Sequence, residues 1–278
     1  ITGQISASKN IYRCVERAGL RVANVTLEPI ASAAAVLSKE EREAGVALVD
    51  IGGGTTDITI FQDGIIRHTA VIPFGGNVIT KDIKDGCTVM TPQAEKLKVK
   101  FGSALAEEVY DNRIITIPGL RGREPKEISE KNLARIIEAR AEEIMDYVMW
   151  EIQRSGFERK LIGGIVLTGG GALLSNVEKL AALQTGMSTR IGLPVERLAH
   201  GYNERLTSPI YATGIGLLIK GIEDVEKGRF RLQQPVVKKE AEAPKEAAIA
   251  EEPEGGKWYE QLFKRTKEWF EAEPDSEL

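Results

Sequence analysis

The clearest hydrophobic pattern in the chain is a pair of β-branched runs, 46–51 and 55–60, on either side of three consecutive glycines. Two short runs separated by a glycine turn predict two antiparallel strands. After a polar turn at 62–64, another apolar run at 65–72 predicts a third strand. The three runs together predict a β-meander.

The segment before this meander shows one helical and one alternating pattern. Ser6 or Ser8 can cap a helix that ends before Gly19. Apolar and polar residues then alternate over 20–28, which predicts a strand.

Two kinds of helix are expected on either side of the meander. Pro29 stands at the start of a helix of small residues, 30–37, whose composition favours close packing on a sheet or another helix. The alternative explanation for these small residues is helix propensity alone. Beyond the meander, the patterns at 77–85 and 91–101 predict two further helices.

The second half of the chain again alternates strands and helices. Ser129 can cap a long helix at 130–155, which carries an apolar stripe on one face. A buried-type strand at 161–167 leads into the glycines 169–171 and a helix predicted at 172–183. A short strand at 190–193 and a small-residue helix at 208–221 follow. This alternation predicts an α/β fold, a mixed sheet with helices on both faces.

Composition and charge restrict the function classes. The chain has 278 residues with a net charge of −4, which gives no electrostatic support for nucleic-acid binding. Cys14 and Cys87 stand alone, which excludes a zinc cluster or disulfide framework and fits a reducing compartment. His68 and His200 have no second ligand type at metal spacing, so a structural role is favoured for both. No apolar run reaches the length of a membrane span.

The first glycine turn has the chemistry of a phosphate site. Backbone N–H groups of Gly52, Gly53 and Gly54 can approach an anion without side chains in the way. Asp50 and Asp57 stand on either side of the turn, where two carboxylates beside a phosphate call for a divalent cation. The alternative is an ordinary hairpin with a glycine-rich turn.

Three further features could belong to the same site. The glycines 169–171 form a second turn that permits close approach, expected to face a helix N-terminus. Glu95 and Lys98 share a helix face, either as a surface ion pair or as contacts to ribose hydroxyls and to adenine. Glu28 lies at a predicted strand-to-helix corner, where polar groups of α/β sheets face a cleft, although a solvated glutamate is the alternative.

The C-terminal region changes composition twice. Residues 222–256 contain few large apolar side chains and are predicted to form a disordered linker. Residues 257–272 become aromatic again and predict an amphipathic helix. Its apolar face consists of Trp258, Tyr259, Leu262, Phe263, Trp269 and Phe270.

This aromatic face needs a partner, because exposed it would be adhesive. A lipid surface, another protein and the folded domain are the three alternatives. Half-burial of the six large side chains in a lipid surface would contribute about 5–8 kcal/mol of binding free energy, before the entropy lost on ordering the helix is subtracted. This favours an interfacial membrane helix.

The motifs occur in an order that resembles the superfamily of actin, sugar kinases and DnaK-type chaperones. They are DIGGGTTD at 50–57, EKLK at 95–98 and IVLTGGGALL at 165–174. A closer resemblance is to FtsA, a family of bacterial actin homologues of cell division. It rests on RHTAVIPFGGNVITKDI, AEKLKVKFGSAL and GLRGREPKEI, together with the linker and the aromatic helix.

This resemblance implies an actin-like (ribonuclease H-like) fold that binds ATP and Mg²⁺. The residues that match the phosphate site of the family are Gly52, Gly53, Gly54, Thr55, Thr56 and Asp57. Asp50 matches the metal-organising carboxylate, and Glu28 matches the position that orients a hydrolytic or magnesium-bound water. The residues that match the adenosine cleft are Glu95, Lys98, Gly169, Gly170 and Gly171.

The resemblance also implies partners and a location. The C-terminal peptide of the ring protein FtsZ is expected on the subdomain around 88–156, with Arg135, Glu138 and Arg140 as candidate contacts. The aromatic helix would bind the inner face of the cytoplasmic membrane peripherally at the division septum. The resemblance further implies self-association into actin-like filaments and recruitment of later division proteins. Any ATPase activity is expected to be weak. ATP would act mainly as a conformational switch.

Two other functions within the superfamily remain alternatives. A sugar or acetate kinase would need a general base for a second substrate and would have no use for the tail. An MreB-like shape-determining filament would carry its membrane contact elsewhere and lacks the GLRGREPKEI loop.

The resemblance divides the chain into parts. The chain opens with Ile1, and the first phosphate loop and a protruding small subdomain of the family have no counterpart here, so we expect both to precede it. The expected parts are the remainder of a first actin-like domain (1–45), a second core domain (46–87 and 157–221, with part of 165–221 packing back on the first), an inserted α+β subdomain (88–156), the linker (222–256) and the membrane helix (257–272).

Overall fold

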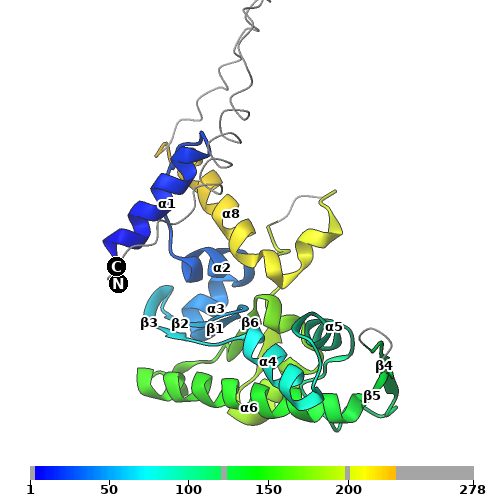
Figure 1. Ribbon diagram of the computed structural model, residues 1–278. Coiled ribbons are helices and arrows are strands. Elements are labelled where there is room, and N and C mark those ends of the chain that lie inside the picture. The colour runs from blue at the N-terminus through cyan, green and yellow to red at the C-terminus, as the bar shows by residue number, and fades with distance from the viewer. Residues whose placement is uncertain (1–3, 120–123, 198–200, 230–278) are drawn as a thin grey trace, which may run out of the picture. The chain divides into compact units, whose positions relative to one another are not determined.

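The structure, a computed structural model, describes residues 4–119, 124–197 and 201–229. The aromatic helix predicted at 257–272 and the linker beyond residue 229 lie outside these ranges. The central feature is a five-stranded sheet with the order β3-β2-β1-β6-β7 (Figure 1). Its strands are β1 (Val46–Ile51), β2 (Thr56–Gln62), β3 (Ile65–Ile72), β6 (Ile165–Thr168) and β7 (Thr189–Ile191).

Strand β1 lies in the middle of this sheet, and every one of its residues is buried. It pairs antiparallel with β2 and parallel with β6, and β2 pairs antiparallel with β3. The predicted meander is therefore confirmed, and the sheet is mixed. The register sets Asp50 opposite Asp57 on one side and Thr168 on the other. The end of β1 thus brings Asp50 beside both glycine turns.

Helices cover both faces of the sheet, as the sequence predicts (Figure 1). One core joins Val49 and Ile51 of β1 to the helices α4, α5, α6 and α7. A second core joins Val46 and Leu48 to α2 and α8. The helices are α1 (Ile5–Arg17), α2 (Glu28–Val36), α3 (Lys39–Ala44), α4 (Gly76–Cys87), α5 (Thr91–Phe101), α6 (Glu130–Ser155), α7 (Val177–Thr185) and α8 (Ala212–Glu226).

The small-residue helix α2 packs unusually close to α8. A Cβ atom on Gly216 of α8 would lie 1.8 Å from the carbonyl oxygen of Ala31. Ala31, Ala33 and Ala35 of α2 are all buried. The close packing predicted from the composition of this helix is confirmed.

A two-stranded antiparallel sheet, β4 (Ile114–Ile117) and β5 (Lys126–Ser129), precedes α6. Its buried isoleucines belong to the same apolar core as the sheet face below α6. The Ser129 hydroxyl accepts a hydrogen bond from the Asn132 N–H at 3.3 Å, so the predicted cap of α6 is confirmed. Leu133, Ile137 and Ile144 form part of its buried stripe.

Several local predictions are wrong. The segment 20–27 forms no strand, because no strand among the described residues pairs with it. Helix α1 begins after Gln4, so Ser6 and Ser8 lie within the helix and do not cap it. Helix α8 runs to Glu226, past the predicted end at Gly221, so the first residues of the predicted linker are helical.

Helix α3 was not predicted from the sequence pattern. Ser38 and Glu41 form a reciprocal capping box, with the Glu41 N–H donating to the Ser38 hydroxyl at 3.1 Å. None of the helices within the described ranges is long and apolar enough to cross a bilayer.

Candidate functional site

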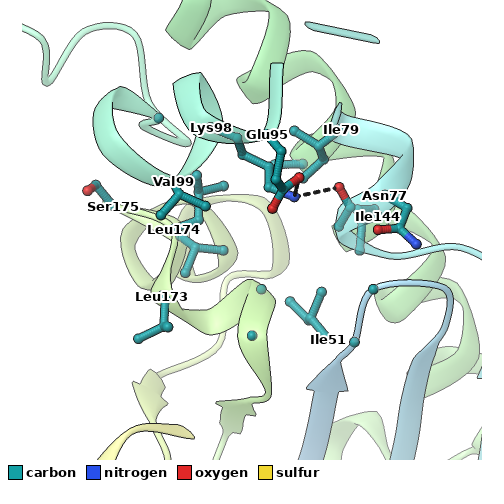
Figure 2. A pocket seen from close by; sticks show the side chains of 18 of the residues that line it. Ile51, Asn77, Ile79, Glu95, Lys98, Val99, Ile144, Leu173, Leu174 and Ser175 are labelled. Atoms are coloured by element: carbon teal, nitrogen blue, oxygen red, sulfur yellow. Dashed lines mark hydrogen bonds and ion pairs between the residues drawn. The ribbon is translucent and has the colours of Figure 1, made fainter. Parts of the chain in front are cut away.

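A cavity of about 320 Å³ brings together three groups of residues that the sequence analysis singles out. Gly52 and Gly53 line it at the end of β1, Gly170 and Gly171 follow β6, and Glu95 and Lys98 come from α5. Figure 2 shows Glu95 and Lys98 across the pocket from Ile51. The pocket therefore assembles segments that are far apart in the chain.

The first glycine turn is fixed by backbone hydrogen bonds to the start of α4. The N–H of Gly76 donates to the Gly52 carbonyl at 2.9 Å, and the N–H of Asn77 donates to the Gly53 carbonyl at 2.8 Å. Within the turn, the Gly52 N–H donates to the Thr55 carbonyl at 2.9 Å. The turn is thus a rigid loop held against a helix N-terminus.

The rest of this motif lies around the turn and not in the pocket wall. Gly54 and Thr55 are exposed at the tip, and no atom lies within 4 Å of a Cβ built on Gly54. The buried Thr56 hydroxyl donates to the Phe74 carbonyl at 2.9 Å, which anchors β2 beside α4. The Thr55 hydroxyl donates to an Asp57 carboxylate oxygen at 3.0 Å.

The second glycine turn approaches the end of β1 so closely that side chains do not fit. A Cβ on Gly169, which has a φ of +81°, would lie 2.3 Å from Asp50 Oδ1. A Cβ on Gly171 would lie 2.3 Å from Ile51 Cγ2. These glycines let β6 and its turn sit directly against the first glycine turn.

The element after this turn differs from the prediction. A 3₁₀ turn at Gly170–Leu173 follows β6, and α7 begins only at Val177, where the sequence analysis expects a helix from residue 172. The N-terminus of α7 therefore does not begin at the glycines. The turn can approach a ligand through its backbone and not through a helix dipole.

Three carboxyl groups surround the first glycine turn. Burial raises the pKa of Asp50 to about 6, while a 3.1 Å hydrogen bond from the Ser32 hydroxyl opposes the rise and the charges of Glu28 and Asp57 add to it. Burial and the charge of Asp57 also raise the pKa of Glu28. Repulsion among acids near a phosphate-type turn is typical of a site completed by a cation.

The described residues do not by themselves form a metal centre at the first glycine turn. Within the described part of the chain, no three His, Cys, Asp or Glu side chains are grouped to hold a metal ion. Oδ2 of Asp50 accepts a hydrogen bond from the Ser32 hydroxyl. The backbone of Gly169 lies close to Oδ1 and restricts access to it. A cation at this place would need further oxygen ligands from the molecule it accompanies.

Glu95 and Lys98 belong to a partly buried polar network with Thr80 of α4. Lys98 Nζ lies 2.8 Å from Glu95 Oε2, so the predicted pair is confirmed. The Thr80 hydroxyl donates to the same glutamate oxygen at 2.5 Å. Burial raises the pKa of Glu95, but the hydrogen bonds from Lys98 and Thr80 outweigh this effect and leave the pKa below its ordinary value.

Apolar side chains form the remaining walls of the pocket, and sequence reasoning missed most of them. Val99, Leu173 and Ile210 are more than half exposed at its edge. Asn77, Leu174 and Ser175 also line the cavity. Asn77 and Leu174 lie within the sequence motifs on which the resemblance to the FtsA family rests. Those motifs are the signal by which both residues could have been predicted. Ile210 lies in no such motif.

The three charged residues proposed on α6 do not form one free patch. Arg140 is hydrogen-bonded to Asp82 of α4 at 2.5 Å and also to Glu143. A Glu138 carboxylate oxygen accepts from the Ala106 N–H at 3.3 Å. Arg135 is exposed and donates to the Asn132 side chain at 3.3 Å. The residues from Trp258 to Phe270 lie outside the described residues.

Comparison with known proteins gives one consistent family. A family model described as "Cell division protein FtsA" matches residues 47–216. FtsA of Pseudomonas aeruginosa is 42% identical over 228 residues, which are 82% of this chain and 54% of that protein. FtsA of Neisseria meningitidis is 38% identical over 272 residues, which are 98% of this chain and 61% of that protein. The chain thus spans little more than half the length of these relatives.

Solved structures show the fold independently. MreB5 of Spiroplasma citri bound to ADP superposes with a TM-score of 0.65 at 22% identity, covering 81% of this chain and 68% of that one. The PilM–PilN type IV pilus biogenesis complex gives a TM-score of 0.57 at 18% identity, covering 78% and 58%. The fold is actin-like, and with the match of the family model over most of the sheet and pocket, the chain belongs to the FtsA family of cell division proteins.

Proposed function

We propose that this chain is part of an ATP-binding, actin-like cell division protein that tethers an FtsZ polymer to the membrane. The observation that carries the proposal is the single pocket that joins both glycine turns to the Glu95–Lys98 pair, in a chain of the FtsA family. The family assignment favours this function over a sugar or acetate kinase and over an MreB-like filament.

The shape and chemistry of the pocket fit a nucleotide. Its volume of about 320 Å³ lies within the range of small-molecule sites. The glycine turns offer backbone to the phosphates, Glu95 offers a carboxylate to ribose hydroxyls, and Val99 and Leu173 offer apolar walls to a base. Two solved structures of similar fold are described as bound to ADP and to AMPPNP, which supports the same ligand class.

The acids around the first turn fit a magnesium ion that arrives with the nucleotide. Phosphate oxygens and water would supply most ligands of the ion, with Asp50 as the nearest buried carboxylate. The bound ion would neutralise phosphate charge. Glu28 and Asp57 would orient water around it, which is consistent with weak hydrolysis and with ATP acting as a conformational switch.

A direct binding measurement tests the nucleotide site. We expect fluorescent ATP to bind the chain and Gly171→Val to abolish binding, because the side chain would occupy the space of Ile51. Gly214→Ala serves as the control, since nothing lies within 4 Å of its Cβ. Thermal unfolding of both variants separates loss of the site from loss of the fold. No binding by the unaltered chain, with its fold intact, would remove the nucleotide proposal for this chain.

The FtsZ C-terminal peptide is proposed to contact α6 and its neighbours. Arg135, Glu138 and Arg140 remain candidate contacts, and Tyr147 and Trp150 add exposed aromatic surface along the same helix. Aromatic and arginine side chains of this kind dominate many protein interfaces.

A matched pair of variants tests the place of Arg140 in this surface. Arg140→Glu is expected to weaken peptide binding at least tenfold through charge reversal. Asp82→Asn breaks the same ion pair without altering α6 and is expected to leave peptide affinity within about twofold. Equal loss in both variants would show that Arg140 acts only through the α4–α6 contact.

The membrane function is proposed from the sequence of the tail. Residues 257–272 would bind the inner face of the cytoplasmic membrane at the division septum, peripherally, while filaments of the actin-like part multiply a weak contact. The filaments would also help recruit later division proteins. Co-sedimentation with liposomes is expected for the full chain and not after deletion of 257–278. Unchanged sedimentation after the deletion would remove the tail from the membrane contact.

A further inference from the structure

The ammonium group of Lys98 contacts three oxygen atoms inside the protein. Nζ lies 2.8 Å from Glu95 Oε2, 2.8 Å from the Thr80 hydroxyl and 3.0 Å from the carbonyl of Gly76. The ammonium donates to the Thr80 hydroxyl and to the Gly76 carbonyl, and it forms an ion pair with Glu95. Its side chain is only 15% exposed, so water does not easily replace these partners.

The partners of Lys98 belong to the two halves of the pocket. Glu95 faces the cavity on the α5 side with 47% of its side chain exposed. Gly76 is the first residue of α4, and its N–H donates to the Gly52 carbonyl in the first glycine turn. One ammonium group therefore links the carboxylate on one wall, through a single residue, to the phosphate-type turn on the other (Figure 2).

We infer that Lys98 is a positioning residue, which fixes Glu95 and the first turn of α4 relative to each other and does not itself contact the base of a bound nucleotide. Lys98 and Thr80 both hold Oε2 of Glu95. Among the described residues, Oε1 of Glu95 has no hydrogen-bond partner. That oxygen is the acceptor for a ligand hydroxyl, and ribose recognition depends on Lys98 only through Glu95.

The identity of the ligand in this inference rests on the proposed nucleotide function. The role of Lys98 rests on the observed contacts. A lysine that reads a base would direct its ammonium group at the base, whereas the ammonium of Lys98 is bonded to the Thr80 hydroxyl and the Gly76 carbonyl of α4. Removing the ammonium here should instead loosen Glu95 and leave the Gly76 carbonyl with one partner fewer, since that carbonyl also accepts from the Thr80 hydroxyl at 3.2 Å. The effects should appear in hydroxyl discrimination and in the backbone around α4, and not in base preference.

The test compares Lys98→Met with Glu95→Gln and with Lys98→Arg as the conservative variant. Binding of ATP, 2′-deoxy-ATP, 3′-deoxy-ATP and GTP is measured by calorimetry on the full chain. We expect the unaltered chain to favour ATP over one of the deoxy analogues by about tenfold, the effect of one hydrogen bond to a charged group. Glu95→Gln and Lys98→Met should both reduce this ratio to within about twofold of one, and Lys98→Arg should restore part of it.

The ratio of ATP affinity to GTP affinity tests whether Lys98 contacts the base. It should stay within about twofold in Lys98→Met, and the inference is overturned if this ratio collapses while the hydroxyl discrimination survives. A change in both ratios would also overturn it, because it would give Lys98 a contact to the base.

A second measurement needs no ligand. Hydrogen exchange of the nucleotide-free protein should speed up at least tenfold at the amides of Gly76 and Asn77 in Lys98→Met, since the turn they hold loses its support. Unchanged exchange at both amides would refute the link to α4. If the unaltered chain binds no nucleotide, the proposed function fails, and exchange alone then supports or refutes the positioning role.

Discussion

Arg140 of α6 donates two hydrogen bonds to Asp82 of α4, from Nε at 2.5 Å and from Nη2 at 3.2 Å. The pair fastens the helix that holds the first glycine turn to the helix that carries the candidate partner contacts. A bidentate guanidinium–carboxylate pair fixes orientation as well as distance. The contact therefore sets how α4 lies on α6.

A double-mutant cycle measures this contact. Arg140→Met, Asp82→Asn and the double variant should show a coupling free energy of unfolding of up to about 1 kcal/mol, because both side chains are partly exposed to water. The coupling should fall when urea unfolding is repeated at high salt. Additive effects of the two single variants would mean that the pair contributes no stability.

The pKa of Asp50 predicts an unusual dependence of stability on pH. Burial raises it to about 6 from 3.8, so between these values the folded state binds more protons than the unfolded state. The contribution of Asp50 to stability should therefore fall as pH rises from about 4 to about 6, and stay level above that range. The difference corresponds to about 3 kcal/mol for this one group.

Asp50→Asn tests this prediction, because the amide keeps the shape without the charge. In EDTA at pH 8, the variant should be more stable than the unaltered chain by about 1–3 kcal/mol, and its stability should lose the decline between pH 4 and 6. Urea unfolding across this pH range provides the measurement. If the variant were less stable than the unaltered chain at pH 8, the buried carboxylate of Asp50 would not be destabilising.

The contact of α8 with α2 predicts opposite effects for two glycines on one helix. Gly216→Ala should destabilise the protein by about 1–3 kcal/mol or more, because its Cβ would meet the Ala31 carbonyl at 1.8 Å. Gly214→Ala meets no atom within 4 Å and should stabilise by about 0.5–1 kcal/mol through helix propensity. Thermal unfolding of both variants makes the comparison, and similar effects would contradict it.

The second glycine turn predicts a change in both stability and binding. Gly169→Ala combines a backbone of φ +81° and ψ 179°, which only glycine adopts readily, with a Cβ placed 2.3 Å from Asp50 Oδ1, so it should destabilise by about 2 kcal/mol or more and abolish ATP binding. Gly186→Ala also has a positive φ, but it lies in the αL region, with φ +67° and ψ 10°, and has open space around it. It should be destabilised by only about 1 kcal/mol and bind ATP normally. Normal ATP binding by Gly169→Ala would show that this turn lies outside the site.

The sequence predicts best those features that local residues determine. The β1–β2 hairpin, the cap at Ser129 and the Glu95–Lys98 pair all depend on neighbours within a few residues, and all are present. The strand predicted at 20–28 fails because a strand needs a partner strand, which no local pattern supplies.

The parts of the site that could not be predicted depend on distant contacts. Asn77 enters the pocket because its N–H is bound to Gly53, and Ile210 enters because a 3₁₀ turn folds back over Gly170. Lys98 is recognisable as a polar residue on a helix face, but its hydrogen bonds to Gly76 and Thr80 require α4 to lie alongside α5. Motif order identifies the family without any of these contacts.

The parallel pairing of β1 with β6 has a consequence for how the chain matures. Asp50 and Thr168 can become neighbours only after every residue from β2 to the end of α6 has been made. The two glycine turns therefore meet through a contact of long sequence separation, and such contacts form slowly. During synthesis, the candidate nucleotide cavity can form only after both turns exist, so ligand affinity would report that these distant parts of the chain have come together.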